Sequence, residues 1–173
     1  MPSNETPQDR HDIEQVLARF CSAVDRMDFE LLRSCFHPGA RTNFGAFVNG
    51  TVEDYLEYVA SPDGLPGLDR TMHQLGNVNY EVDGDVAHAE SYVTAYHEAP
   101  EDHAWCQGFV VVWARYIDRL EKRDGAWRIA SRTCVFEFGR NLTTGEPMEL
   151  PPDQMGRRDR SDLRYERSAA VSA

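Results

Sequence analysis

Four long runs of β-forming residues follow one another in the second half of the chain, with no helical segment between them. They are rich in Val, Tyr, Trp and Thr and cover residues 72–82, 86–97, 104–121 and 127–138. Consecutive strands without intervening helices pair in antiparallel fashion, which disfavours the Rossmann and P-loop folds. Because strands of ten or more residues exceed the usual length, we expect a strongly bent sheet that curls around other elements.

The first part of the chain has helical periodicity instead. Between residues 12 and 27, apolar side chains recur at the spacing of one buried helix face: Ile13, Val16, Leu17, Phe20, Cys21 and Val24. Asp28 can cap a second short helix over residues 29–36, and the apolar spacing from Val52 to Val59 predicts a third helix that ends near Pro62. Helices followed by antiparallel strands define an α+β domain, whose bent sheet should enclose the first helix and a cavity.

The periodic pattern spans residues 12–138, which we expect to form one domain. Residues 1–11 are polar and are expected to be a disordered N-terminus. Residues 139–173 lose the apolar period and collect Pro and Arg, which predicts an extended C-terminal arm and tail. No apolar run has the length of a signal peptide or of a spanning helix, so the expected location is cytoplasmic.

The net charge and the spacing of possible metal ligands exclude several classes of binding partner. The chain has 18 Lys and Arg against 29 Asp and Glu, a net charge of −11, which repels nucleic acid and anionic membranes. The four cysteines are scattered singly, and His97 and His103 flank acidic residues without metal-ligand spacing. We therefore expect no metal, no cofactor and an exposed acidic loop. His97, at a strand end, is placed to reach the mouth of the cavity.

Four motifs carry a resemblance to a known family. AVDRMD (residues 23–28), CFHPGAR (35–41), TMHQLGN (71–77) and LEKRDGAWRIASR (120–132) resemble the SnoaL-like branch of the nuclear transport factor 2-like superfamily over about residues 12–138. The resemblance implies a cone-shaped barrel in which N-terminal helices pack in a strongly curved, mostly antiparallel sheet. The motifs are most similar to those of hexachlorocyclohexane dehydrochlorinases and scytalone dehydratases, which perform cofactor-free eliminations with a His–Asp pair.

The resemblance implies catalytic roles for Asp25, His73 and Arg132. His73 would be the general base, Asp25 would orient it and balance its charge, and Arg132 would stabilise a developing anion. The dehydrochlorinase pattern has a Lys where this chain has Phe20, which argues against loss of chloride. On the residues alone, Asp25 is more simply a solvated helix-end residue or a partner of Arg26, and a structural role is the commoner case for a lone histidine such as His73. Arg132 can equally form a salt bridge at the rim.

Strand alternation bears on Arg132. If the last strand alternates regularly, Trp127, Ile129 and Ser131 share one face and Arg132 lies on the opposite face. Only the face that lines the cone can contribute to a site. The role of Arg132 therefore depends on which face that is.

Aromatic residues on the expected elements predict an apolar substrate pocket. The candidate substrate-binding residues are Phe20, Phe44, Tyr55, Tyr96 and Trp113. The predicted function is a cofactor-independent lyase or isomerase that performs a dehydration, an elimination or a double-bond migration on a hydrophobic cyclic or aromatic small molecule. Two alternatives remain: a non-catalytic small subunit of a ring-hydroxylating dioxygenase, and a ligand-binding module of the same fold.

The outer face of the sheet predicts self-association. An isolated cone would leave apolar residues such as Val110, Val112 and Trp113, or their alternates, in water. We therefore expect a homo-oligomer. The resemblance favours a trimer over a dimer, with the arm over residues 139–164 packed on a neighbouring subunit.

Overall fold

Helices and a single bent sheet form the two parts of the fold in the computed structural model, which describes residues 6–142 and 157–161. The helices are α1 (Pro7–Asp25), α2 (Phe29–Ser34), α3 (Val52–Ala60) and the short 3-10 helix η1 (Leu65–Gly67). The strands are β1 (Phe36–Asn43), β2 (Asn49–Thr51), β3 (Arg70–Asp83), β4 (Val86–Ala99), β5 (Gly108–Arg123) and β6 (Ala126–Leu142). The α+β architecture with a strongly curved sheet agrees with the sequence prediction.

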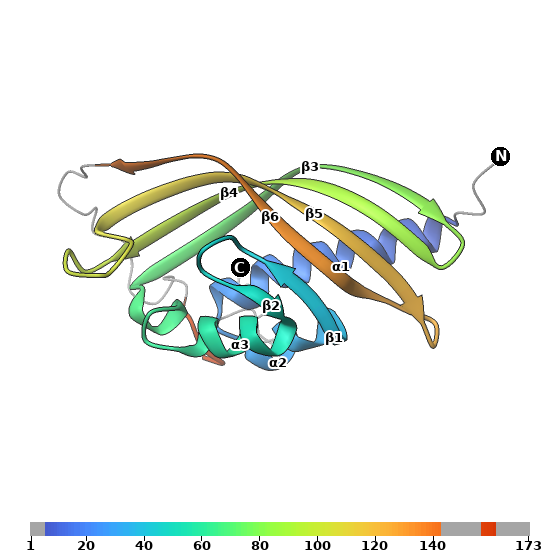
Figure 1. The fold of residues 1–173 in the computed structure, drawn as a ribbon, viewed down its shortest axis with the longest axis horizontal. Helices are drawn as coiled ribbons and strands as arrows, with labels where there is room; N and C mark the ends of the chain where they lie inside the picture. Colours follow the sequence, from blue (N-terminus) through green and yellow to red (C-terminus); the bar gives the residue numbers. More distant parts are fainter. Residues whose placement is uncertain (1–5, 143–156, 162–173) are drawn as a thin grey trace, which may run out of the picture.

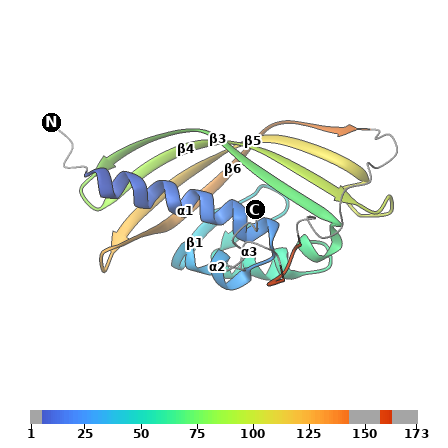
Figure 2. The ribbon, with the colours of Figure 1, turned by 180° about the vertical axis from the view of Figure 1, so that it is seen from behind.

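The sheet has the order β2-β1-β6-β5-β4-β3, and only the β1–β6 pair is parallel. It is not closed, because β2 and β3 remain as edges. Figures 1 and 2 show β3 to β6 arching over α1, with α2 and α3 gathered beneath the arch. The concave side holds the core, where the buried face of α1 with Ile13, Leu17 and Phe20 packs against the sheet.

Helix α1 begins earlier than its apolar periodicity indicates. Thr6 caps the helix, and its hydroxyl and the Asp9 side chain form a reciprocal capping box. Asp9 also accepts hydrogen bonds from Trp127 Nε1 at 2.8 Å and Lys122 Nζ at 2.9 Å, which tie the first turn to the β5–β6 hairpin. Residues 7–11, expected to be disordered, are therefore helical, because polar capping contacts hold them in place of apolar ones.

The end of the domain is also displaced. Strand β6 continues to Leu142, past residue 138 where we expected the domain to end. Residues 1–5, 143–156 and 162–173, which include most of the expected arm and tail, lie outside the described residues. In the part of the chain that the structure describes, no helix is long and apolar enough to cross a membrane.

Candidate active site

Asp25 and His73 meet inside the cone. Asp25 is the last residue of α1, and α1 packs against β3, which carries His73. Oδ1 of Asp25 lies 2.7 Å from Nδ1 of His73, and the backbone N–H of His73 donates to Oδ2 at 2.9 Å. The two side chains are only 11% and 9% exposed. Both carboxylate oxygens therefore hold the same residue, which fixes the position of the imidazole.

This geometry determines which ring nitrogen is available. Nδ1 donates its proton to Asp25, so in the neutral imidazole Nε2 carries the free lone pair. Burial alone would raise the pKa of Asp25, but the hydrogen bonds and the charge of His73 outweigh it, and the pKa is lowered. The carboxylate therefore stays ionised beside the imidazole.

The pair borders an apolar cavity of about 350 Å³ to which His73 contributes. Phe20, Phe44 and Tyr55, three of the expected substrate-binding residues, line it. Further lining residues come from η1, the residue after it, the β4–β5 connection and the inner faces of the strands: Leu65, Leu68, Val93, Ala95, Trp105, Tyr116 and Phe136. This is a pocket for a hydrophobic ligand with few polar groups.

Tyr96 and Trp113 were wrongly assigned to the pocket. The inner face of β4 carries buried residues such as Val93, Ala95 and His97, and Tyr96 alternates with them onto the outer face. Trp113 stacks on Phe138 at a centroid distance of 4.7 Å, and it does not line the cavity. The small residues of β4 could have shown which face of the strand points inward, because a concave face that packs against a helix favours small side chains.

His97 lines the cavity, whereas the sequence analysis predicted only that it could reach the cavity mouth. Its ring lies edge-on to His73, with centroids 5.5 Å apart, and edge-on to Trp105 at 5.2 Å. Burial and, as a smaller contribution, the charge of His73 lower the pKa of His97 to about 3. Nδ1 of His97 is buried and has no hydrogen-bond partner among the described residues. His97 is therefore a neutral imidazole with one polar atom left for a ligand.

Arg132 occupies neither of the positions considered from the sequence. It is fully buried, and its Nε and Nη2 each donate to Asp118 at 2.7 Å. Its guanidinium lies between the rings of Phe20 and Tyr116, 4.0 and 4.1 Å from their centroids. Burial alone would lower the pKa of Arg132, but the charge and hydrogen bonds of Asp118 raise it. Arg132 therefore stands behind the cavity wall as half of a buried ion pair, not at a rim.

A β-bulge explains why the alternation argument failed. Ile129 pairs with Leu120 and Ser131 pairs with Arg119, so Ala130 is an extra residue in β6. Ile129 and Arg132 consequently share the buried face, where regular alternation would have separated them. The extra residue brings Arg132 opposite Asp118.

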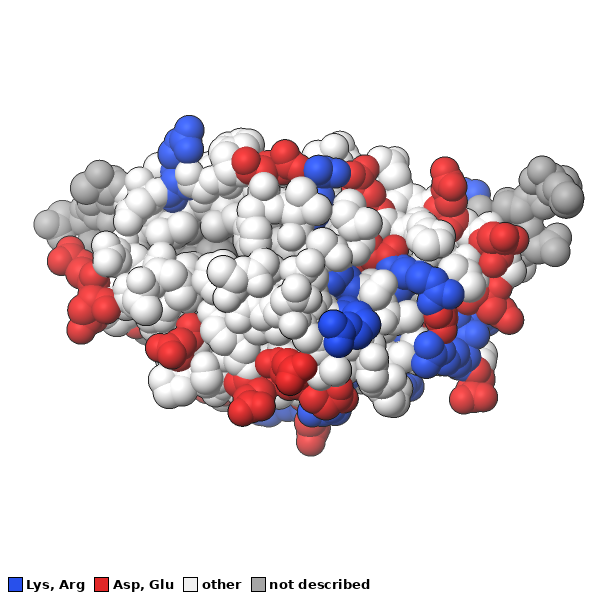
Figure 3. All heavy atoms as spheres, in the orientation of Figure 1, with Lys and Arg blue, Asp and Glu red and all other residues white. Residues whose placement is uncertain are grey.

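Charged side chains are unevenly distributed over the surface. Figure 3 shows few charged side chains over the middle of the face in view, with carboxylates along the lower margin and most charges toward one end. Within the described ranges, no three His, Cys, Asp or Glu side chains come together as a metal site. The polar side chains that line the cavity are Glu137, the two histidines His73 and His97, and residues with aromatic rings such as Tyr55, Tyr58 and Tyr116.

The fold and the site together define a cone-shaped α+β domain with a buried Asp–His pair at an apolar cavity. The model of the SnoaL-like domain matches residues 5–133, so the chain belongs to the SnoaL-like domain family. A comparison with curated proteins found no match.

Solved structures share the fold. Hexachlorocyclohexane dehydrochlorinase LinA-type3 from Novosphingobium barchaimii is 19% identical with a TM-score of 0.67, and the match covers 83% of this chain and 96% of that chain. A protein provisionally named as a scytalone dehydratase from Novosphingobium aromaticivorans is 17% identical, with a TM-score of 0.67 and coverages of 80% and 90%. A protein of unknown function from Mycobacterium tuberculosis is 27% identical, with a TM-score of 0.63 and coverages of 76% and 78%.

Proposed function

We propose that this protein is a cofactor-independent lyase or isomerase that removes a proton from carbon in a hydrophobic cyclic or aromatic small molecule. The observation that carries the proposal is the 2.7 Å hydrogen bond between Asp25 and His73 at the wall of an apolar cavity. Structural similarity to a dehydrochlorinase and to a protein provisionally named as a dehydratase supports the same class of reaction.

His73 acts as the general base in this proposal. Nε2 accepts the proton from a carbon made acidic by a neighbouring carbonyl or leaving group, and the imidazolium that forms is stabilised by the ionised Asp25. In an elimination, the electron pair of the broken C–H bond forms a double bond as the leaving group departs. In an isomerisation, the proton returns at another carbon.

Neutral donors in the cavity wall stabilise the developing negative charge. Burial raises the pKa values of Tyr55 and Tyr116, so both hydroxyls remain protonated over the neutral range. His97, which is also neutral, adds an imidazole beside His73. These three residues take the role that the resemblance assigned to Arg132, whose charge is already paired with Asp118.

The test is proton exchange from carbon. A panel of cyclic and aromatic ketones and β-hydroxy ketones is incubated with the protein in D2O, and NMR follows deuterium incorporation and product formation. We expect His73→Ala and Asp25→Asn to reduce the rate at least about 100-fold, because both halves of the base are required. His88→Ala, which removes an exposed histidine from β4, serves as the matched control and should retain the wild-type rate.

The contrary result is equally specific. A His73→Ala variant that exchanges and converts these compounds at the wild-type rate would contradict the proposal. Binding of cyclic ligands by the wild type without exchange or turnover would favour the ligand-binding module.

A further inference from the structure

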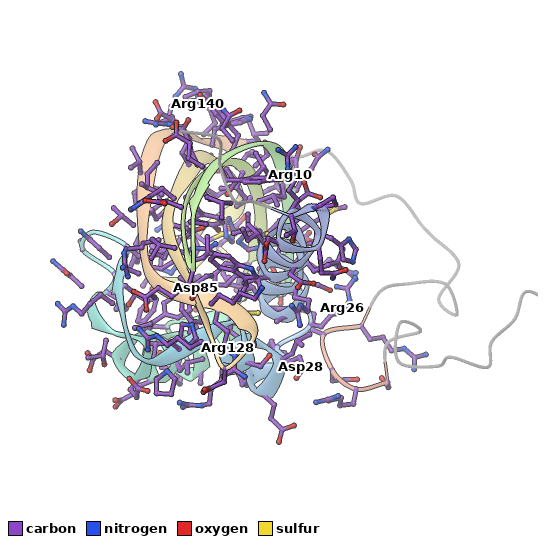
Figure 4. The ribbon with its side chains drawn as sticks, turned by 90° about the vertical axis from the view of Figure 1, so that its right-hand side faces the viewer. Arg10, Arg26, Asp28, Asp85, Arg128 and Arg140 are labelled. Carbon is purple, nitrogen blue, oxygen red and sulfur yellow. The ribbon has the colours of Figure 1, made fainter. Side chains whose placement is uncertain are left out.

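A short segment distant in sequence lies against the end of α1. Arg160 Nη2 lies 3.1 Å from Oδ1 of Asp28 and 3.4 Å from Oε2 of Glu30. Asp28 is buried and also caps α2 by accepting from the Leu31 N–H at 3.1 Å. In Figure 4, Arg26 and Asp28 lie on the side where this segment passes. We call residues 157–161 the strap.

The strap brings a second cation to the domain. Nη1 of Arg158 donates to the backbone carbonyl of Leu68, whose residue lines the cavity. Nε and Nη2 of Arg158 are buried and have no hydrogen-bond partner among the described residues. Arg132 uses these same two nitrogens to bind Asp118. Among the described residues, Arg158 therefore forms no bidentate ion pair of the kind that Arg132 forms with Asp118.

The charge of Arg158 acts on the candidate active site. Burial lowers the pKa of Arg158, and the negative charges that oppose this belong to Asp25 of α1 and Asp69, with Arg26 as the nearby cation. On β4, the charge of Arg158 contributes to the lowered pKa of His97. On β3, His73 contacts Asp25 directly. The buried guanidinium of Arg158, held at the Leu68 carbonyl, is therefore close enough to Asp25 for the two charges to interact.

We propose that Arg158 is a positioning residue of the active site, delivered by the docked strap. Its fixed positive charge favours an ionised Asp25. The Asp25 carboxylate in turn holds Nδ1 of His73, which leaves Nε2 oriented to accept a proton. This inference rests on the proposed function for its catalytic meaning, but the electrostatic coupling can be measured without a substrate.

The experiment is a pH titration of the Asp25 carboxyl by 13C NMR in the full-length chain, with the resonance assigned by its absence in Asp25→Asn. We expect Arg158→Met to move the midpoint of Asp25 protonation upward by about 1 pH unit, because a neighbouring cation is lost. Arg157→Met removes the same charge from the exposed neighbouring residue and should shift the midpoint far less. Arg158→Lys should restore most of the wild-type value.

Two further readouts separate coupling from a loss of folding. Arg160→Met removes the contact with Asp28 without touching Arg158, and it should shift Asp25 in the same direction as Arg158→Met. Once a substrate is found, Arg158→Met should move the acid limb of the pH–rate profile to higher pH while the plateau rate is largely kept. A merely structural role would lower the rate at all pH values.

An unchanged Asp25 midpoint in a folded Arg158→Met variant would overturn the inference, as would an equal shift in Arg157→Met. These outcomes are independent of whether His73→Ala abolishes activity. A failure of the inference and a failure of the proposed function can therefore be told apart.

Discussion

Asp25 and Asp118 both point into the interior of the cone, and their partners give them different roles. Asp118 binds Arg132, which keeps its charge at any accessible pH, so this pair is fixed and serves packing between Phe20 and Tyr116. Asp25 binds His73, whose protonation can change during a reaction. The same carboxylate chemistry is thus structural at Asp118, whereas in the proposed function it is catalytic at Asp25.

His97 should give the protein a distinctive dependence of stability on pH. The pKa of His97 is lowered to about 3 in the folded state, whereas an unfolded histidine titrates near 6.5. The unfolded state therefore binds more protons between these values, and the free energy of unfolding falls as pH drops from about 6.5 towards 3. At about 1.4 kcal/mol per pH unit, His97 alone accounts for a loss of about 3 kcal/mol between pH 7 and pH 4.

Urea unfolding at these two pH values checks this prediction. His97→Leu should flatten the dependence by roughly that amount, because the buried titratable group is gone. His88→Ala removes an exposed histidine and should keep the wild-type slope. Equal slopes in wild type and His97→Leu would show that His97 is protonated as readily in the folded chain as in the unfolded chain.

At the scale of elements, the cavity depends on how tightly the segment after α3 closes. Leu65 and Leu68, from η1 and the residue after it, line one wall of the cavity. Gly64 precedes them, and a Cβ at this position would lie 2.4 Å from the carbonyl oxygen of Tyr58 and 2.7 Å from that of Val59. Only a residue without a side chain allows η1 to approach the end of α3 in this way.

Gly64→Ala should therefore destabilise the fold by about 1–3 kcal/mol, because backbone atoms would have to move apart. Gly139→Ala is the matched control, since a Cβ there would lie 3.5 Å from the Val111 carbonyl oxygen, an ordinary contact. Urea unfolding at neutral pH measures both. A Gly64→Ala variant as stable as Gly139→Ala would contradict the close packing of η1 on α3.

At the scale of the whole molecule, the outer face of the sheet leaves large apolar side chains in water. Met72, Tyr92 and Ile117, on the neighbouring strands β3, β4 and β5, are 64%, 46% and 40% exposed. Trp113 and Phe138 stack on one another nearby, and Phe138 is itself exposed. A monomer rarely keeps such a face uncovered, which supports the proposal that copies of this chain associate through it.

We expect a trimer of the 19.7 kDa chain in sedimentation equilibrium at micromolar concentration. Met72→Lys should weaken the assembly, because a charge in the middle of an apolar interface must be desolvated. Phe47→Lys changes an exposed apolar residue at the cavity and should leave the mass unchanged. A wild-type mass equal to one chain would contradict the proposal.

Local sequence patterns were sufficient for the elements and for part of the candidate site. The buried face of α1, the cap of α2, the presence of α3 and the four long strands follow from periodicity and turn residues, whose effects act over a few positions. Asp25 and His73 were found because their surrounding motifs resemble a family. The contact between them agrees with that expectation, while their catalytic role stays a proposal.

The remaining features were decided by tertiary structure. One extra residue at Ala130 places the residues after it in β6 on the opposite face from regular alternation. Arg132 therefore pairs with Asp118 and does not line the cavity. His97 lies beside His73 because β4 pairs with β3. Arg158 lies near the site because the strap contacts the residues that follow α1. None of these contacts has a local signal. Each depends on segments far apart in the chain meeting at a bulge, a bend or a docking contact, and local periodicity does not encode these positions.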